Sequence, residues 1–365
     1  MRIIHIIPSL NSGGAETMLY KLIKNRQKEY DIEIVTLLSG GFYAEKIRAL
    51  NIPIHELNFK NKKNVFKSIT LLVKTLKRAD IIQSWMYHSD LISLLFGKTL
   101  MKKKVIWGIR RSYLEKKHLK KRTYYIAKLC AYFSKYVDGI VSCTIVGKVR
   151  HRDFGYENQN FEVISNGFEI NESYCNQPVD LKSPSKIKFL NIARWEPLKD
   201  HRNLLAALQK VKKTGIQFEL LLVGNGIDEN NKKLLDMIIE YDLYKEVKLL
   251  GVRNDIPGLM KNADIYVSSS LSEGFPNVIG EAMAAGLYCV ATDAGDTKYL
   301  IDDFGILVEV GSPTALAEGI LSAVKMDKSD LLKMKNQARK RIENEFSIQH
   351  IVDKYEVMYQ KIMDK

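Results

Sequence analysis

The sequence predicts an α/β protein made of two doubly wound, Rossmann-like domains. Short apolar runs alternate with segments of helical period along both halves of the chain, a pattern typical of parallel sheets covered by helices. The 365 residues exceed one ordinary core, and a polar stretch containing Pro178 and Pro184 separates the halves. With 46% hydrophobic and 27% charged residues, the composition is that of a globular protein and not of a disordered one.

The first half contains a series of strand-like runs with helical patterns between most of them. We expect these runs to form the parallel sheet of an N-terminal Rossmann-like domain over residues 1–170. They cover residues 2–8, 33–39, 52–58, 80–85, 104–110, 139–144 and 161–167. The polar residues 171–186 that follow are predicted to be a linker.

The alternation restarts in the second half, which predicts a C-terminal Rossmann-like domain over residues 187–345. Its strand-like runs cover residues 188–194, 219–224, 247–251, 264–270 and 288–295. The tail is helical by pattern, with Ser312 as the cap and Pro313 as the first residue of one helix. We expect a last helix over residues 346–365 to pack back on the N-terminal domain.

Cysteine usage and hydropathy indicate a cytoplasmic protein. Four scattered cysteines, none in a CxxC pair, indicate reduced thiols and not a disulfide framework. Pro8 and a polar cluster interrupt the N-terminal apolar run where a signal peptide would continue. No run of 18 apolar residues occurs, so any membrane contact should be peripheral.

The stretch SEGFPNVIGE places two carboxylates, Glu273 and Glu281, around a turn at a predicted strand end. Pro276 suits the first turn of the next helix, and Gly286 suits its end. The amides of this helix start attract anions, whereas two unit charges ~4 Å apart repel by roughly 4 kcal/mol at an effective dielectric near 20. The glutamates should therefore bind neutral hydroxyl groups, one on each sugar of a nucleotide sugar.

The longer stretch SSSLSEGFPNVIGEAMAAG resembles the donor-binding signature of the family 4 retaining glycosyltransferases. The resemblance extends over nearly the whole chain and includes SLNSGGAE near the start, NG at residues 166–167 and FS at residues 346–347. It implies the GT-B architecture, in which residues 1–170 would bind the acceptor and residues 187–345 the nucleotide sugar. It further implies retaining transfer of a sugar, with a UDP-sugar as the expected donor. It also implies a glycan or lipid-linked acceptor in the synthesis of a bacterial surface polysaccharide such as lipopolysaccharide or capsule.

The resemblance implies roles for individual residues. Arg194 and Lys199 would bind the donor phosphates and stabilise the leaving group, and Glu273 would hold the donor sugar. The remaining donor-binding positions would be Gly13, Gly14, Gly224, Gly226, Val252, Arg253, Gly274, Phe275, Pro276, Asn277 and Glu281. Without the resemblance, each of the cations could equally be a solvated surface charge, and a glycine loop such as LLVGNG is a weak signal.

Three further residues are candidates for contact with the acceptor or the donor sugar. His88 follows the fourth predicted strand, and Arg110 and Arg111 follow the fifth. The family often has a histidine after the fifth strand, so the arginines are a departure that leaves the role of that histidine unassigned. An arginine at this position could bind an anionic acceptor such as a lipid diphosphate.

The sequence contains no motif typical of a metal site or a serine nucleophile. We therefore expect a metal-independent site without a cofactor, in which the acceptor hydroxyl attacks on the leaving group's side and the departing phosphate accepts its proton. Positioning and electrostatic stabilisation would supply the catalysis.

The net charge of +14 fits an acidic partner but does not identify one. The basic stretch at residues 98–128 is the main candidate for such a contact. Residues 98–128 hold twelve Lys/Arg against one acid, Glu115, and are interleaved with Trp107, Tyr113, Tyr124 and Tyr125. A nucleic acid, a solvated face and an anionic membrane surface are the alternatives. No nucleic-acid-binding module accompanies the stretch, so we expect no nucleic acid partner and favour peripheral contact with the inner face of the cell membrane.

A second enzyme class with the same architecture, the nucleotide-sugar 2-epimerases, is the main alternative activity. Such an enzyme should carry additional acidic and histidine catalytic groups, and the sequence offers no clear position for them. Release of nucleotide with or without glycosylation of an acceptor separates the two classes.

Overall fold

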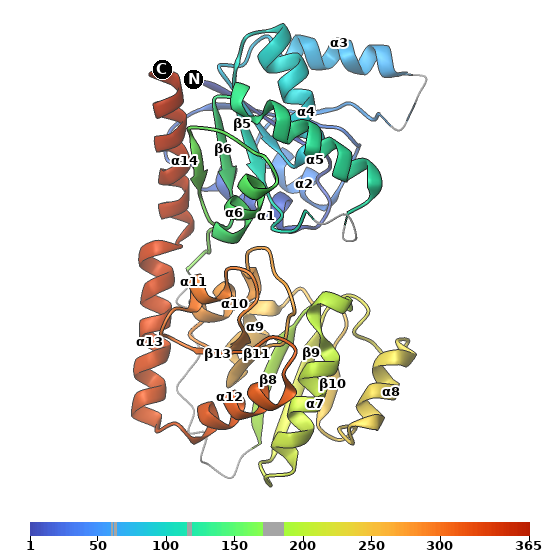
Figure 1. Ribbon diagram of the computed structural model, residues 1–365, viewed down its shortest axis with the longest axis vertical. Helices are drawn as coiled ribbons and strands as arrows, with labels where there is room; N and C mark the ends of the chain where they lie inside the picture. Colours follow the sequence, from blue (N-terminus) through green and yellow to red (C-terminus); the bar gives the residue numbers. More distant parts are fainter. Residues whose placement is uncertain (60, 62–63, 115–118, 171–185) are drawn as a thin grey trace. The chain divides into compact units, whose positions relative to one another are not determined.

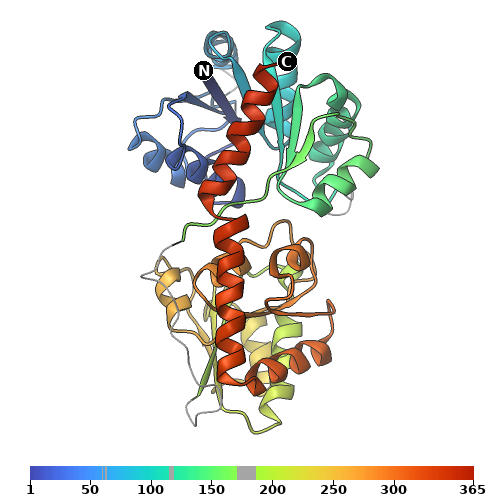
Figure 2. The same ribbon diagram turned by 90° about the vertical axis from the view of Figure 1, so that its left-hand side faces the viewer.

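The computed structural model describes residues 1–59, 61, 64–114, 119–170 and 186–365. The chain divides into two compact units, shown in Figures 1 and 2: unit 1 is Met1–Gly167 with Ile348–Lys365, and unit 2 is Phe168–Ser347. Each unit is a parallel sheet covered by helices, so the predicted fold class is confirmed. Residues 171–185 of the predicted linker, which include Cys175, and residues 115–118 of the basic stretch lie outside the described residues.

Unit 1 is built on a seven-stranded parallel sheet in the order β3-β2-β1-β4-β5-β6-β7. Its central strands are apolar almost throughout because helices cover both faces. The strands are β1 (Arg2–Ile7), β2 (Asp31–Thr36), β3 (Ile54–Glu56), β4 (Ile81–Trp85), β5 (Lys104–Ile109), β6 (Gly139–Ser142) and β7 (Phe161–Val163).

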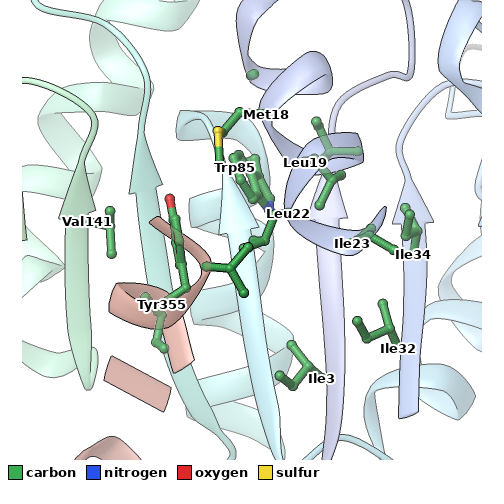
Figure 3. Packing of buried hydrophobic residues seen from close by; sticks show 14 of the residues in the cluster. Ile3, Met18, Leu19, Leu22, Ile23, Ile32, Ile34, Trp85, Val141 and Tyr355 are labelled. Atoms are coloured by element: carbon green, nitrogen blue, oxygen red, sulfur yellow. The ribbon is translucent and has the colours of Figure 1, made fainter. Parts of the chain in front are cut away.

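The helices of unit 1 form two layers. One layer consists of α1 (Gly14–Lys24), α2 (Phe42–Arg48) and α14 (Ile348–Met363), and Figure 3 shows side chains of α1 and α14 packed against the strands. The opposite layer includes α3 (Val65–Leu76), α4 (Tyr87–Ile92) and α5 (Lys121–Phe133). Three further segments complete the unit: the π-helix η2 (Ser93–Leu100), the 3-10 turn η3 (Ser134–Tyr136) and α6 (Ile145–Asp153).

Helix α14 comes from the far end of the sequence and is held on unit 1 by a cluster around Arg110. The guanidinium lies 4.2 Å from the ring centre of Trp85, and this indole stacks on Tyr355 of α14. Arg110 also donates to the Tyr355 hydroxyl (2.6 Å) and to Asn166 Oδ1 (2.9 Å). We name Trp85, Arg110, Asn166 and Tyr355 the α14 clamp.

Unit 2 has a six-stranded parallel sheet in the order β10-β9-β8-β11-β12-β13. The strands are β8 (Ile187–Ile192), β9 (Phe218–Val223), β10 (Val247–Leu249), β11 (Ile265–Ser268), β12 (Tyr288–Thr292) and β13 (Ile306–Val308). The predicted strands did not include β13, a three-residue strand at the edge of the sheet.

The helices of unit 2 again cover both faces of the sheet. On one face α7 (His201–Lys212), α8 (Lys232–Glu240) and α12 (Pro313–Lys325) enclose the main apolar core, and Ser312 caps α12 through Ala315. Helices α10 (Asn277–Ala284), α11 (Thr297–Ile301) and α13 (Lys328–Glu345) pack on the other side. The short η5 (Pro197–Lys199) and α9 (Ile256–Lys261) follow β8 and β10. Within the described ranges, no helix is both long and apolar enough to cross a membrane.

Candidate active site

The loops that follow β8, β9 and β10 are bound to one another through their backbones. The amide of Ala193 donates to Val223 O (2.9 Å), and the amide of Trp195 donates to Asn225 O (2.8 Å). The amide of Gly224 donates to Gly251 O (2.8 Å). The predicted cation Arg194 therefore stands on a loop that the end of β9 holds on both sides, at the edge where parallel sheets bind ligands.

Gly224 and Gly226 are required by the close approach of these loops. Gly224 has φ +149° and Gly226 has φ +74°, conformations that L side chains rarely adopt. A Cβ on Gly224 would overlap the carbonyl oxygen of Ala193, and one on Gly226 would lie 2.9 Å from the Cβ of Trp195. The predicted glycine loop thus forms a backbone wall beside Arg194.

The signature loop lies between β11 and α10. Gly286 follows the end of α10 at φ +75°, as the turn chemistry predicts. Pro276 occupies the cap position before Asn277 and not the first turn in which it was expected. The backbone around Glu273 is fixed from the other side by Gly295, where a Cβ would overlap the carbonyl oxygen of Glu273. Thr292 Oγ1 also donates to Ser270 O (2.6 Å).

Glu273 and Lys199 form an ion pair in unit 2. Lys199 Nζ lies 2.5 Å from Glu273 Oε1, and the two side chains are 22% and 15% exposed. Ser270 Oγ donates to the same oxygen (2.7 Å), and the loop that carries Lys199 is held by Ser269 Oγ, which donates to Lys199 O (2.9 Å). The structure therefore brings two predicted catalytic residues together, through a pairing that their separate motifs did not predict.

A cavity of about 110 Å³ lies beside this ion pair. Its lining includes Lys199, Glu273, Phe275, Pro276 and Asn277, together with Asn191, Ile192, Ala193, Tyr266, Ser268, Ser270, Val278 and Ile279. The volume is that of a few water molecules, at ~30 Å³ each, so the cavity takes only one part of a larger ligand.

Tyr266 forms part of this cavity and was missed by the sequence analysis. Burial, followed by the negative charges of Glu273 and Glu281, raises its pKa well above the usual value for tyrosine. Both glutamates of the signature therefore act on the same buried ring, one from the loop and one from the second turn of α10. A tyrosine inside an apolar strand carries no sequence signal that separates this role from simple packing.

Three predicted donor-binding residues have exposed side chains. Arg194 pairs with Glu196 (3.2 Å) and is 66% exposed. Val252 is 72% exposed, and Arg253 is bound to Asp255 at 2.6 Å. Among the described contacts, these residues share no partner with Lys199 or Glu273, and their donor-binding role stays a prediction.

In unit 1, the predicted loop Gly13–Gly14 opens helix α1 and is covered by a carboxylate. A Cβ on Gly13 would lie 2.5 Å from Glu16 Oε2. Glu16 is buried, burial raises its pKa, and its side chain is bonded to its own backbone amide and to Ser9. Glu16 was not among the predicted site residues, and its place three positions after the Gly13 cap matches only the acidic half of a capping box.

The other predicted residues of unit 1 differ in their surroundings. His88 is exposed on the first turn of α4, and partial burial lowers its pKa. Arg111 is exposed, whereas Arg110 belongs to the α14 clamp. Contact of these residues with acceptor or sugar stays a prediction.

The described part of the chain holds no group of three or more His, Cys, Asp or Glu residues placed to bind a metal ion.

Two family models match the chain, and their ranges lie end to end. Residues 12–172 match Glycosyltransferase Family 4, and residues 176–341 match Glycosyl transferases group 1. The first range contains the Gly13–Gly14 loop, His88 and the two arginines, and the second contains the whole Lys199–Glu273 site.

Proteins of similar sequence and structure are known from several bacteria. The chain is 26% identical over 292 residues to the capsular polysaccharide biosynthesis glycosyltransferase CapH of Staphylococcus aureus, covering 77% of this chain and 78% of CapH. It is 27% identical over 180 residues, 48% of each chain, to N-acetylgalactosamine-N,N'-diacetylbacillosaminyl-diphospho-undecaprenol 4-alpha-N-acetylgalactosaminyltransferase of Campylobacter jejuni. The crystal structure of Anabaena HepE in complex with UDP superposes with a TM-score of 0.86 at 22% identity, covering 99% of this chain and all of HepE. HepE has also been solved with UDP-glucose.

Proposed function

Because this chain belongs to the group 1 and family 4 glycosyltransferases, we propose that it moves a hexosyl group from a UDP-sugar to a glycan or lipid-linked acceptor, with retention of configuration. The observation that carries the proposal is the Lys199–Glu273 pair beside a cavity at the carboxyl edge of unit 2. The likeness to CapH supports a role in capsule or another surface polysaccharide. The UDP complexes of HepE support the donor class.

The donor site is proposed to follow the loops of unit 2. The uridine contacts Val252 and Arg253, and the ribose hydroxyls donate to Glu281. The diphosphate lies along the Gly224–Gly226 wall and near the α10 N-terminus, where Gly274 and Asn277 stand and where backbone amides favour an anion. Arg194 turns from Glu196 toward the phosphates, as its exposed side chain allows.

Lys199 and Glu273 are proposed to act as one unit. An ammonium group has three donors, so Lys199 can keep its bond to Glu273 while it donates to the β-phosphate. Glu273, held by Lys199 and Ser270, accepts a hydroxyl of the donor sugar with its remaining lone pairs. The acceptor hydroxyl forms the new bond to C1 on the side where the C1–phosphate oxygen bond breaks, and the departing phosphate takes the hydroxyl proton. The two cations stabilise the charge that grows on UDP.

The acceptor is proposed to approach through residues of unit 1. His88 and Arg111 are exposed at the carboxyl ends of β4 and β5, where a sugar or a lipid diphosphate can reach them. The Campylobacter relative is named for a diphospho-undecaprenol acceptor, which supports a lipid-linked acceptor for this chain. Such an enzyme works in the cytoplasm, at the inner face of the cell membrane.

The function is tested by product analysis. Purified enzyme with UDP-glucose, UDP-galactose or their N-acetyl forms should release UDP only when an acceptor is present, and NMR of the new linkage should show the donor's anomeric configuration. Activity should survive a chelator. Inverted configuration, or inhibition by chelation that manganese reverses, would contradict the mechanism. Nucleotide release without glycosylation would instead indicate a 2-epimerase.

The cation pair is tested by substitution. Arg194→Ala and Lys199→Ala should each lower kcat by a factor of about 10² to 10³, the effect of removing one preorganised partner of transition-state charge. Lys210→Ala, an exposed lysine of α7, serves as the control and should leave kcat unchanged. Full activity of either variant would exclude that cation from catalysis.

A further inference from the structure

The outward side of α5 carries an unusual row of exposed large side chains. Tyr125 is 59% exposed, Leu129 43%, Tyr132 70% and Tyr136, in η3, 54%. Their spacing of three or four residues places them on one side of the helix. The opposite side, with Ala127, Cys130 and Ala131, is buried in the core of unit 1.

Cations are interleaved with these rings, and acids are absent. The described residues 119–137 include five cations, Lys120, Lys121, Arg122, Lys128 and Lys135, and no Asp or Glu. None of the five makes an ion pair with another described residue, in contrast to Lys98, which is bound to Asp138 at 2.7 Å. We name Lys121, Arg122, Tyr125, Lys128, Leu129, Tyr132, Lys135 and Tyr136 the α5 outer face; Figure 1 shows α5 on the layer opposite α14.

The aromatic and apolar residues of the basic stretch and the rest of α5 fall into two groups, those packed in the core of unit 1 and those left on its surface. Trp107, grouped above with the surface aromatics, is fully buried and donates to Ser93 Oγ (3.1 Å). Tyr124 and Phe133 are partly buried against the core of unit 1. Leu129, which simple packing of α5 would bury, is left exposed. The apolar groups that remain outside are those that alternate with cations.

The α5 outer face fits the headgroup region of an anionic bilayer. Tyrosine rings favour that region because one end is apolar and the other polar, and lysine stems reach along apolar surface while their ammonium groups meet lipid phosphates. A single strand of nucleic acid would instead need a basic groove with stacking platforms, whereas this surface is the convex side of one helix. A protein partner would have to be strongly acidic to match it.

We propose that the α5 outer face docks on an anionic phospholipid surface, with Tyr125, Leu129 and Tyr132 inserted among the headgroups. It deepens the proposed function, because a lipid-linked acceptor lies in the same membrane. Membrane docking is inferred from the exposed rings of α5 and from cations that make no ion pair with another described residue. The docking proposal and the proposed function can therefore fail separately.

The test is flotation of the full chain with vesicles of phosphatidylcholine alone or mixed with equal phosphatidylglycerol. The chain should bind the mixed vesicles only, and about 0.5 M salt should release it because screening then acts within a few ångströms. Lys121→Gln, Arg122→Gln and Lys128→Gln together should lower partitioning roughly a hundredfold, given about fivefold per charge. Tyr125→Ser with Tyr132→Ser should lower it as well.

The control removes the same charge from unit 2, with Lys210→Gln, Lys213→Gln and Lys232→Gln, all at exposed positions, and should bind as the wild type does. Equal binding to both lipids, absent binding at low salt, an equal loss in the control, or tighter binding to a single-stranded oligonucleotide would overturn the proposal. Transfer to a water-soluble sugar acceptor should be unchanged in the α5 variants. If the wild type does not transfer sugar to the water-soluble acceptor, the proposed function is contradicted, whereas the vesicle result still stands.

Discussion

Glu273 and Glu281 differ in what fixes them, although both act on Tyr266. Glu273 is held by Lys199 and Ser270 on a loop, whereas Glu281 projects from α10. Removing the charge from each should therefore affect different steps of the reaction.

Glu281→Gln should weaken the binding of UDP by about 1 to 3 kcal/mol, because the ribose hydroxyls lose a charged acceptor. Glu273→Gln should leave UDP affinity nearly unchanged and lower kcat, since only the pose of the donor sugar depends on it. Titration calorimetry with UDP, beside steady-state kinetics, separates the two. Equal losses of UDP affinity in both variants would show that the roles are wrongly divided.

Asp90 predicts a pH-dependent stability for unit 1. Burial, which outweighs hydrogen bonds from Ser84 Oγ (2.6 Å) and the Gly108 backbone, raises the pKa of Asp90 to about 7. An unfolded aspartate has a pKa near 4, so between these values the folded chain binds more protons. The stability that Asp90 contributes is then complete below about pH 4 and is lost as the pH rises through about 7.

Asp90→Asn should remove this dependence. Denaturant unfolding should show that the free energy of unfolding of the wild type, relative to the variant, falls by about 2 to 3 kcal/mol between about pH 5 and about pH 8. Parallel curves for the two proteins would mean that Asp90 does not hold its proton in the folded state.

Single residues were predictable where the chemistry is local. Gly286 lies where a glycine after a helix is expected, and Pro276 lies one residue before the helical turn in which it was expected. The Lys199–Glu273 pair spans 74 positions, and Arg110 meets Tyr355 across 245. No local pattern encodes such partners, and for this reason the sequence did not indicate the α14 clamp in which the structure places Arg110. An acceptor contact of Arg110 stays a prediction.

Among the elements, the loops that bear the candidate site depend on the glycine at position 224. Gly224→Ala should lower the free energy of unfolding by about 2 to 4 kcal/mol, because strain at a positive φ adds to an overlap with the Ala193 carbonyl. UDP affinity should fall with it. Gly215→Ala is the matched control: its φ is +86° and its Cβ would meet nothing within 4 Å, so a cost of about 1 kcal/mol is expected. Equal losses in thermal unfolding would show that the loop contact is unimportant.

Apolar runs and helical periods in the sequence predict most of the strands and helices, but not every edge strand or hydrogen-bond pattern. The continuous apolar runs predicted the central strands, whose residues are buried on both faces of each sheet. They did not predict the edge strand β13 or the π-helical winding of Ser93–Leu100. The second depends on hydrogen-bond register, which side-chain pattern does not report.

For the molecule as a whole, we expect the α14 clamp to help to hold the last helix on unit 1. Arg110→Ala would leave the Tyr355 hydroxyl and Asn166 Oδ1 without this donor and remove a cation from the Trp85 face. We expect a loss of about 2 to 4 kcal/mol, seen as faster amide hydrogen exchange throughout α14.

The neighbouring exposed residue provides the control. Arg111→Ala should change the stability of unit 1 by no more than about 0.5 kcal/mol. Unchanged exchange in α14 of the Arg110 variant would mean that the apolar contacts of the helix suffice.

Because unit 1 contains both ends of the chain, its last helix is synthesised after the whole of unit 2. A ribosome makes the chain from its first residue, so all of unit 2, Phe168–Ser347, emerges before Ile348–Lys365 does. During that interval the newborn unit 1 presents Ile3, Leu19 and Trp85, which α14 later helps to cover, to water and to other nascent chains. A protein truncated after Ser347 would retain every residue of the candidate site in unit 2. Without α14, however, its apolar surface on unit 1 would stay exposed, and it would become a substrate for chaperones and proteases.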